Sequence, residues 1–254
     1  MLTIRNAQLA ALAEWPRRRF EIALATHLGR YFPHECERGD VLRFVRLGID
    51  RSEYRGCETQ LDIAWYLNLM VMLGCDFDRD PQIPWAGGDL DDPSVPSLSG
   101  RLSRVYEAAL RYLEETGGAN NSHLARAKLR IRRFDLAELD GLDDDALPAG
   151  LVAFLYSIYP EKAKCQAQAP MQALVEAAIE SARGRGATTA RAVGIHALHM
   201  FMLGCGYGRD PLYCWLNGAL DDDGAGPVDA RFNRLMQASL AYIETTLRNQ
   251  DTES

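Results

Sequence analysis

The chain has 254 residues, of which 47% are hydrophobic and 25% charged, and its net charge is −7 at pH 7. This length and composition are typical of a globular protein and allow one large domain or two ordinary ones. The negative net charge argues against a protein that binds nucleic acid through a broadly basic surface. The longest apolar stretch, residues 63–73, is shorter than the roughly 20 residues that cross a bilayer, so we expect no membrane insertion.

Apolar periodicity predicts helices along the first half of the chain, over about 6–31, 40–55, 60–73 and 98–115. Pro16 should interrupt the first of these helices, and Pro33 follows its end. Gly56 stands where a left-handed C-cap residue would, and Thr59 is placed to cap the third helix. That third helix is apolar nearly all round, which is typical of the buried centre of a bundle. Asp80 is placed to cap a further short helix.

The second half of the chain repeats the first. Residues 70–92 and 200–222 align without gaps at an offset of 130, and 13 of these 23 positions are identical. Average residue frequencies would give roughly one or two identities. Upstream, the offset is 127, and it matches Leu2, Ile4, Leu9 and Leu12 with Leu129, Ile131, Leu136 and Leu139.

We therefore predict an all-α fold made of two tandem copies of a helical bundle unit of about 120 residues, related by internal duplication, in which the second copy repeats the helices of the first. The expected boundaries are residues 1–116 for the first unit, 117–127 for a flexible linker, 128–248 for the second unit and 249–254 for a polar tail.

The best-conserved part of the internal repeat is a box of the form Gly-Cys-x-x-x-Arg-Asp-Pro-x-x-x-Trp. In it glycine ends one helix, Asp-Pro begins the next, and tryptophan supplies a large apolar surface. Its arginines, Arg79 and Arg209, could pair with a carboxylate or bind an anion. A purely structural role, in forming the corner between these two helices, explains every residue of the box. If the box instead binds a partner, Arg79, Arg209, Trp85 and Trp215 are the candidate protein-interface residues.

Two sets of residues have side chains of the types that bind metal ions. Asp76, Asp78 and Asp80 imitate the start of a calcium-binding loop, but the glycine at the sixth position and the closing glutamate are missing, so no calcium is expected. His196 and His199 share one face of a predicted helix and could ligate a metal. No third ligand is evident, which favours core or interface histidines and leaves a metal-dependent enzyme as an alternative.

Catalytic motifs are lacking in the sequence. There is no GxSxG elbow and no glycine-rich phosphate loop, so we expect neither a catalytic site nor a cofactor. Carboxylate pairs such as Asp91-Asp92 are interpreted as solvated turn residues. Six cysteines without a CxxC motif, and the lack of a secretory signal, indicate free thiols in a reducing cytoplasm.

Between the two units, a basic run precedes an acidic one. Arg130, Arg132 and Arg133 belong to the first run, and the second covers residues 135–145. A solvated face with local ion pairs accounts for this pattern. The alternative is a docking strip, and it would make the chain a structural scaffold.

Two stretches resemble a known group of proteins. They are residues 2–33, which open with LTIRNAQLAAL and end with YFP, and residues 73–85, which contain LGCDFDRDP and end with Pro-Trp. Together they are similar to uncharacterised helical accessory proteins encoded near type VI secretion spike-tip (VgrG or PAAR) and effector genes. The resemblance covers most of the first unit, and the glycines at 206 and 208 depart from it in the second.

This resemblance implies a cytoplasmic, non-enzymatic role in which the chain binds a secreted toxic effector, a spike-tip protein or both. A chaperone or loading adaptor for the effector is the leading expectation, and an immunity protein that neutralises the effector is the alternative. The sequence leaves the oligomeric state open.

Overall fold

The computed structural model is all-α in the residues it describes, which are 6–221 and 226–252 for the backbone and 16–220 and 226–247 for the side chains. In those ranges it has thirteen α-helices and no strand. The first half contains α1 (Asn6–Tyr31), α2 (Pro33–Cys36), α3 (Val41–Tyr54), α4 (Gln60–Leu73), the 3₁₀ turn η1 (Phe77–Arg79), α5 (Pro84–Leu90) and α6 (Leu98–Gly117). The second half contains η2 (Ala119–Asn121), α7 (Ser122–Arg133), η3 (Leu136–Leu139), α8 (Leu147–Ile158), α9 (Pro160–Cys165), α10 (Gln168–Gly184), α11 (Ala190–Leu203), η4 (Tyr207–Arg209), η5 (Pro211–Tyr213), α12 (Cys214–Asp221) and α13 (Val228–Thr252).

Three of the predicted helix signals in the first half act where the sequence places them, but the prediction for Asp80 is wrong: α5 begins only at Pro84, after Ile83, and Asp80 accepts from the Gln82 N–H in a turn. The Asp40 carboxylate accepts a hydrogen bond of 3.0 Å from the Arg43 N–H and begins α3. The Thr59 hydroxyl accepts one of 3.1 Å from the Asp62 N–H and begins α4. Gly56 follows α3 with φ +88°, as a left-handed residue after a helix should. The predicted bounds of these helices are confirmed to within a residue or two.

The first long helix differs from its prediction. The interruption near Pro16 is wrong, because α1 runs through that residue. Since proline has no N–H and crowds the preceding turn, it removes one hydrogen bond from the helix. In the second half the matching stretch is instead divided into α7, η3 and α8. Asp135 and Asp143 accept hydrogen bonds from Ala137 and Ala146 at the two breaks, so side chains there replace helical bonds.

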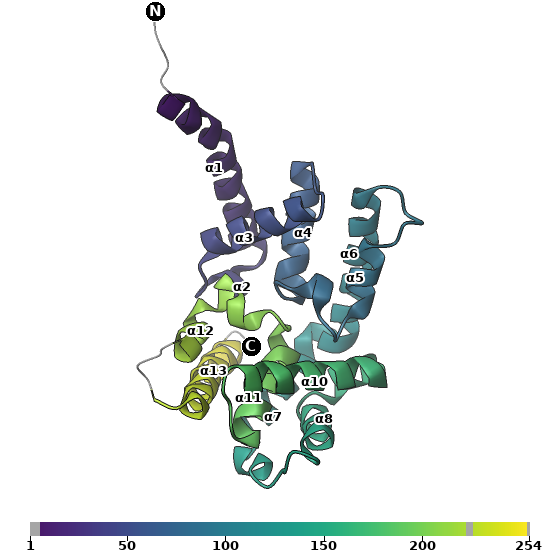
Figure 1. Cartoon of the computed structure of the whole chain (residues 1–254), viewed down its shortest axis with the longest axis vertical. Coiled ribbons are helices and arrows are strands. Elements are labelled where there is room, and N and C mark those ends of the chain that lie inside the picture. The colour runs from purple at the N-terminus through teal and green to yellow at the C-terminus, as the bar shows by residue number, and fades with distance from the viewer. Residues whose placement is uncertain (1–5, 222–225, 253–254) are drawn as a thin grey trace, which may run out of the picture.

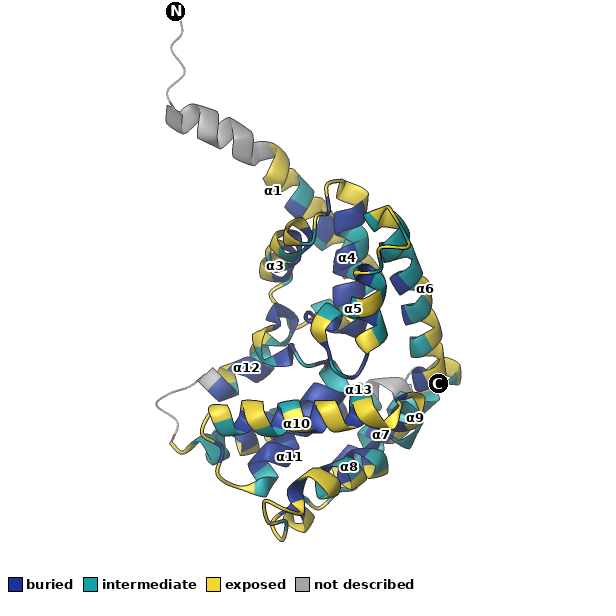
Figure 2. Cartoon of the chain, turned by 45° about the vertical axis from the view of Figure 1, so that its right-hand side comes forward, coloured by how far each residue is buried: buried dark blue, intermediate teal, exposed yellow. Residues whose placement is uncertain are grey.

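Each half of the chain has its own hydrophobic core. The first core surrounds α4, whose Leu67, Leu69 and Met70 have no exposed surface. The second surrounds α11, in which all ten residues from 192 to 201 are buried. Leu212 from the second half belongs to the first core, so the two cores meet. Figure 2 shows how exposed and buried residues alternate along α10, which presents one face to this second core.

Figure 1 shows α3, α4 and α6 on one side of the molecule and α7, α8, α10 and α11 on the other, with the N-terminal half of α1 leading away from the body. The predicted linker consists of the end of α6, η2 and the first turns of α7. It is held by Tyr159, whose hydroxyl donates a hydrogen bond of 2.8 Å to the Thr116 carbonyl. Among the helices described, none is both long and apolar enough to cross a membrane.

Candidate functional site at the junction of the two halves

The two Gly-Cys boxes pack against each other at the junction. Gly74 and Gly204 end α4 and α11 with φ values of +100° and +93°. A Cβ on Gly74 would lie 2.8 Å from the Leu203 carbonyl oxygen, and one on Gly204 would lie 3.0 Å from that of Leu73. Glycine is required at both places because the backbone is left-handed there and the opposite chain is too close for a side chain.

Aspartates exchange hydrogen bonds across this contact. The Cys205 N–H donates to Asp80 Oδ2 at 2.8 Å, and the Cys75 N–H donates in the opposite direction to Asp210. Each aspartate also holds its own chain, since Gln82 N–H donates to Asp80 and Leu212 N–H to Asp210, both at 2.9 Å. The aspartate of each box therefore ties its own loop to the loop of the other half.

Burial changes the acidity of these groups. Desolvation raises the pKa of Asp210 to about 6 and also raises that of Asp80, although backbone N–H donors oppose both shifts. Lys162 is half-buried, and desolvation lowers its pKa to about 8 against the attraction of Asp80. Its ammonium group donates to the Phe201 carbonyl at the end of α11. Gln82 spans the same contact with a hydrogen bond of 2.8 Å to the Met200 carbonyl.

Asp76 adds a charged bridge to the junction. It is buried and pairs with Arg51 of the first half and with Arg209 of the second. Arg209 thus does pair with a carboxylate, as its sequence context allowed, while 71% of its side-chain surface stays exposed. Its counterpart Arg79 is exposed, and Gly206 stands at the position where a matching carboxylate would be.

The two box tryptophans are half-buried beside tyrosines of the last helix in each half. Trp85 lies 6.0 Å from Tyr112 between ring centroids, and Trp215 lies 5.0 Å from Tyr242. The guanidinium of Arg38 sits 5.6 Å from the Trp215 ring centroid, in a cation–π arrangement that links the two halves. These tryptophans hold the corner in place and leave only part of their surface for a partner.

The histidines of α11 lie in the second core. His196 Nδ1 is 2.6 Å from the Tyr207 hydroxyl, and His199 contacts the Ile195 carbonyl and the Ser239 hydroxyl, both at 2.7 Å. Burial lowers the pKa of His196 to about 3 and that of His199 to about 4, so both are neutral. Both nitrogens of His199 are already in hydrogen bonds, which a metal would have to displace. No cluster of three potential metal ligands occurs among the described residues.

Local ion pairs use four of the charges between the two units, those of Arg126, Arg130, Asp140 and Asp144. Arg130 lies 3.3 Å from Glu161, and Arg132 and Arg133 are exposed on α7. In the acidic run, Asp140 pairs with Arg191 and Asp144 with Arg183. This matches the solvated face with local ion pairs.

The Asp91-Asp92 turn is solvated, as predicted, since Asp91 is exposed and Asp92 half-buried, and both carboxylates also make ion pairs there. Asp91 lies 2.8 Å from Arg55, and Asp92 pairs with Arg104. Nearby, Asp78 accepts a hydrogen bond of 2.7 Å from Arg55. These carboxylates hold α3 and α6 to the box loop.

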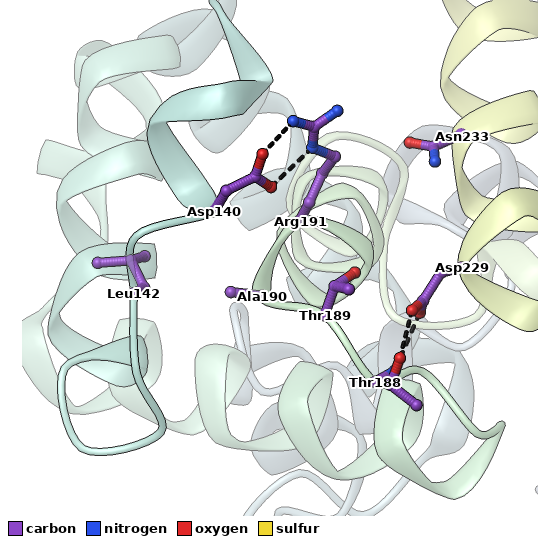
Figure 3. Close-up of a pocket in the computed structure, with 8 residues that line it drawn as sticks. All are labelled: Asp140, Leu142, Thr188, Thr189, Ala190, Arg191, Asp229 and Asn233. Atoms are coloured by element: carbon purple, nitrogen blue, oxygen red, sulfur yellow. Dashed lines mark hydrogen bonds and ion pairs between the residues drawn. The ribbon is translucent and has the colours of Figure 1, made fainter.

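A shallow cavity of about 540 Å³ opens at the start of α11 (Figure 3). Its lining residues are Asp140, Leu142, Thr188, Thr189, Ala190, Arg191, Asp229 and Asn233. Asp229 accepts hydrogen bonds from the Thr188 N–H, at 2.9 Å, and from its hydroxyl, while Asp140 holds Arg191. The donors that would attract an anion are therefore occupied by the protein's own carboxylates.

The carboxylates of the junction accept hydrogen bonds from backbone N–H groups or pair with guanidinium ions, and these contacts hold the two halves together. We call this junction the lock between the two halves. Comparison with protein-family models, curated proteins and solved structures finds no match for the chain. The box is recognisable in the sequence, but its partners Arg51, Lys162 and Gln82 are not. The glycines at 206 and 208, where the first box has Asp76 and Asp78, are the signal in the sequence that the two boxes differ in role.

Proposed function

We propose that this chain is a protein-binding accessory protein of bacterial type VI secretion, and that it acts as chaperone or loading adaptor for a toxic effector. The observation that carries the proposal is the buried lock between the two halves, which makes one preformed body from both. A binder whose surface is set before contact loses less conformational entropy on association. Residues 2–33 and 73–85 resemble accessory proteins encoded near type VI secretion genes, and this resemblance is the reason for proposing that secretion system and an effector as partner.

Exposed apolar surface supports a binding face on the first half. In the part of the chain with described side chains, every exposed large hydrophobic residue lies there: Ile22, Tyr31, Leu42, Tyr54, Leu61 and Leu110. Ile22 and Leu42 belong to α1 and α3, which pack together through pairs such as Glu21 with Arg46. Apolar side chains gathered on neighbouring helices are a feature of protein-binding surfaces.

Internal duplication is part of the same proposal. Helices α4 and α11 occupy positions 130 residues apart, as do η1 and η4, and the box aspartates make reciprocal hydrogen bonds. We infer that an ancestral unit of this kind paired through its box, and that fusion of two copies made the pairing permanent. The second copy then lost the carboxylates at 206 and 208.

An immunity protein is the second candidate. A rigid surface that spans both halves would suit a protein that covers the active site of a folded toxin, because such a surface needs no rearrangement to block it. The two roles use the same contact and differ in its effect on the toxin.

Affinity purification from the native cells, with mass spectrometry of what stays bound, tests the proposal. A toxin or spike-tip protein in stoichiometric amount supports it, and the protein alone contradicts it. Ile22→Asp with Leu42→Asp should release the partner, whereas Arg132→Glu with Arg133→Glu should not. If the arginine pair releases it instead, α7 is the contact and the chain is the scaffold considered above.

A toxicity assay then separates the two roles. Co-expression of the identified toxin with this chain should leave its toxicity in place but raise its abundance and secretion if the chain is a chaperone. Abolished toxicity with unchanged secretion would assign the immunity role.

A further inference from the structure

One face of the first half, formed by α4 and α6, is less covered than its counterpart in the second half. We call it the α4–α6 face, and its residues are Leu61, Ala64, Trp65 and Asn68 of α4 with Tyr106 and Leu110 of α6. Leu61 is 64% exposed and Leu110 is 49% exposed, and the other four are half-buried. Of the six residues that stand 130 positions later, four are buried. The second half thus covers a surface that the first half leaves open.

Short helices supply the cover in the second half. Helix α8 and the turn η3 lie on α11, the counterpart of α4, and α7 lies on α13, the counterpart of α6. Gly194 of α11 is so close to its cover that an added Cβ would be 2.5 Å from Leu139 Cδ1 of η3 and 3.4 Å from Leu151 Cδ2 of α8. In the described part of the first half, the helices packed most extensively on α4 are α3 and α6. The second half therefore shows which kind of element such a face takes.

Contacts between its two helices hold the α4–α6 face in shape. The Ser99 hydroxyl of α6 donates a hydrogen bond of 2.6 Å to the Asp62 carboxylate of α4, and the rings of Trp65 and Tyr106 lie 5.5 Å apart between centroids. The four α4 residues of the face stand at positions i, i+3, i+4 and i+7, so they form one row along about two turns of helix. A partner that binds this row finds a surface that is already ordered, which lowers the entropy lost on association.

The composition of the face selects a helix over a strand or a loop. None of its six residues is charged, and five of them are aliphatic or aromatic. A strand or loop laid on such a surface would bury backbone N–H and C=O groups with few partners, whereas a helix pairs its own backbone groups internally. Recognition of a helix in a groove uses apolar side chains at i, i+3, i+4 and i+7 of the bound segment. The occupant that fits is therefore an amphipathic helix.

Carboxylates border the face on α6. Glu107 and Glu114 stand three residues before and four residues after Leu110, so they share its side of the helix, and both are exposed. Neither is in an ion pair within the part of the chain whose side chains are described. Arg111 is also exposed, but it is turned by about 100° from Leu110, to the flank farther from α4. The border beside Leu110 is negative and favours basic side chains on the partner.

We propose that the α4–α6 face docks an amphipathic helix of a partner protein, with apolar side chains against Leu61 and Leu110 and basic side chains beside Glu107 and Glu114. The inference rests on the proposed protein-binding role, to which it adds the chemistry of the bound segment and a contact apart from α1 and α3. The chain itself contains a segment of this kind. Residues 122–139, which form α7 and η3, lie on the counterpart helices and have five basic and two acidic residues.

A synthetic peptide of residues 122–139 is the probe, and fluorescence anisotropy measures its binding to the full chain. Leu61→Asp should weaken the binding by roughly tenfold or more. Since Leu61 is largely exposed, this variant keeps the fold. Leu42→Asp is the matched control and should leave the binding unchanged, because Leu42 is likewise the exposed second residue of a helix.

Two further variants test the chemistry of the contact. Glu107→Lys with Glu114→Lys in the chain should weaken the binding and remove most of its dependence on salt, because charges at the border act through the screened field. In the peptide, Ile131→Asp with Leu139→Asp should abolish binding although most of the basic residues remain, since both side chains are buried in the second half. Equal binding of the two peptides would mean that charge alone attracts the probe, and that would overturn the proposal.

Other results would overturn it as well. No binding at roughly 1 mM peptide would do so, and so would equal binding by the unmodified chain and Leu61→Asp. Light scattering that shows a dimer dissociated by Leu61→Asp would mean that a second copy occupies the face. The purification test with Ile22→Asp and Leu42→Asp is independent of this probe, so the docking site and the proposed function can fail separately.

Discussion

Removing the carboxylate of Asp80 should weaken the lock between the two halves more than any exposed ion pair could. Asp80 is 2% exposed and accepts hydrogen bonds from Cys205 N–H at 2.8 Å, Gln82 N–H at 2.9 Å and Gln82 Nε2 at 3.3 Å. Asp80→Ala leaves these donors without an acceptor. An unsatisfied buried donor costs about 1–3 kcal/mol, so we expect a total loss of roughly 3–5 kcal/mol in the free energy of unfolding.

Urea denaturation measures this loss, with Asp92→Ala as the matched control. Asp92 also pairs with an arginine, Arg104, but at the surface, where such a pair contributes about 0–1 kcal/mol. Asp80→Asn should fall between the two, because its amide keeps one oxygen as acceptor. If Asp80→Ala and Asp92→Ala cost the same, the junction is not the lock described above.

Two further predictions concern pH and the box loop. His196 and His199 have lowered pKa values in the folded state, so the unfolded state binds their protons first and the free energy of unfolding should fall below pH 6.5. The expected loss is about 2 kcal/mol for each histidine between pH 7 and 5. The raised pKa of Asp210 acts in the opposite direction and should add roughly 1 kcal/mol over the same range. Replacing both histidines with residues that do not titrate should reverse the sign of this change in urea denaturation. Gly206→Asp should cost roughly 3 kcal/mol or more in thermal unfolding, because its Cβ would lie 2.8 Å from the Asp76 carboxyl carbon. An unchanged melting temperature would contradict that contact.

The local signals of the sequence were sufficient for most of the helices. Thr59 and Asp40 cap helices because their short side chains reach the free N–H groups nearby, and that depends on residues within one turn. The all-round apolar character of α4 likewise predicted a buried helix, since apolar area is removed from water wherever such a helix packs. Pro16 misled the same reasoning, because α1 tolerates its missing hydrogen bond.

The sequence by itself determined the all-α class, most of the helix starts and stops in the first half and the recurrence of the box, since these depend on neighbouring residues and on identity at a fixed offset. Only the tertiary structure decided that Asp80 and Asp210 reach across to the other half, that Asp76 joins Arg51 to Arg209, and that His196 is a neutral core residue. These contacts join residues up to about 130 positions apart, and no local pattern reports which distant surfaces meet, because that depends on how all the helices pack at once.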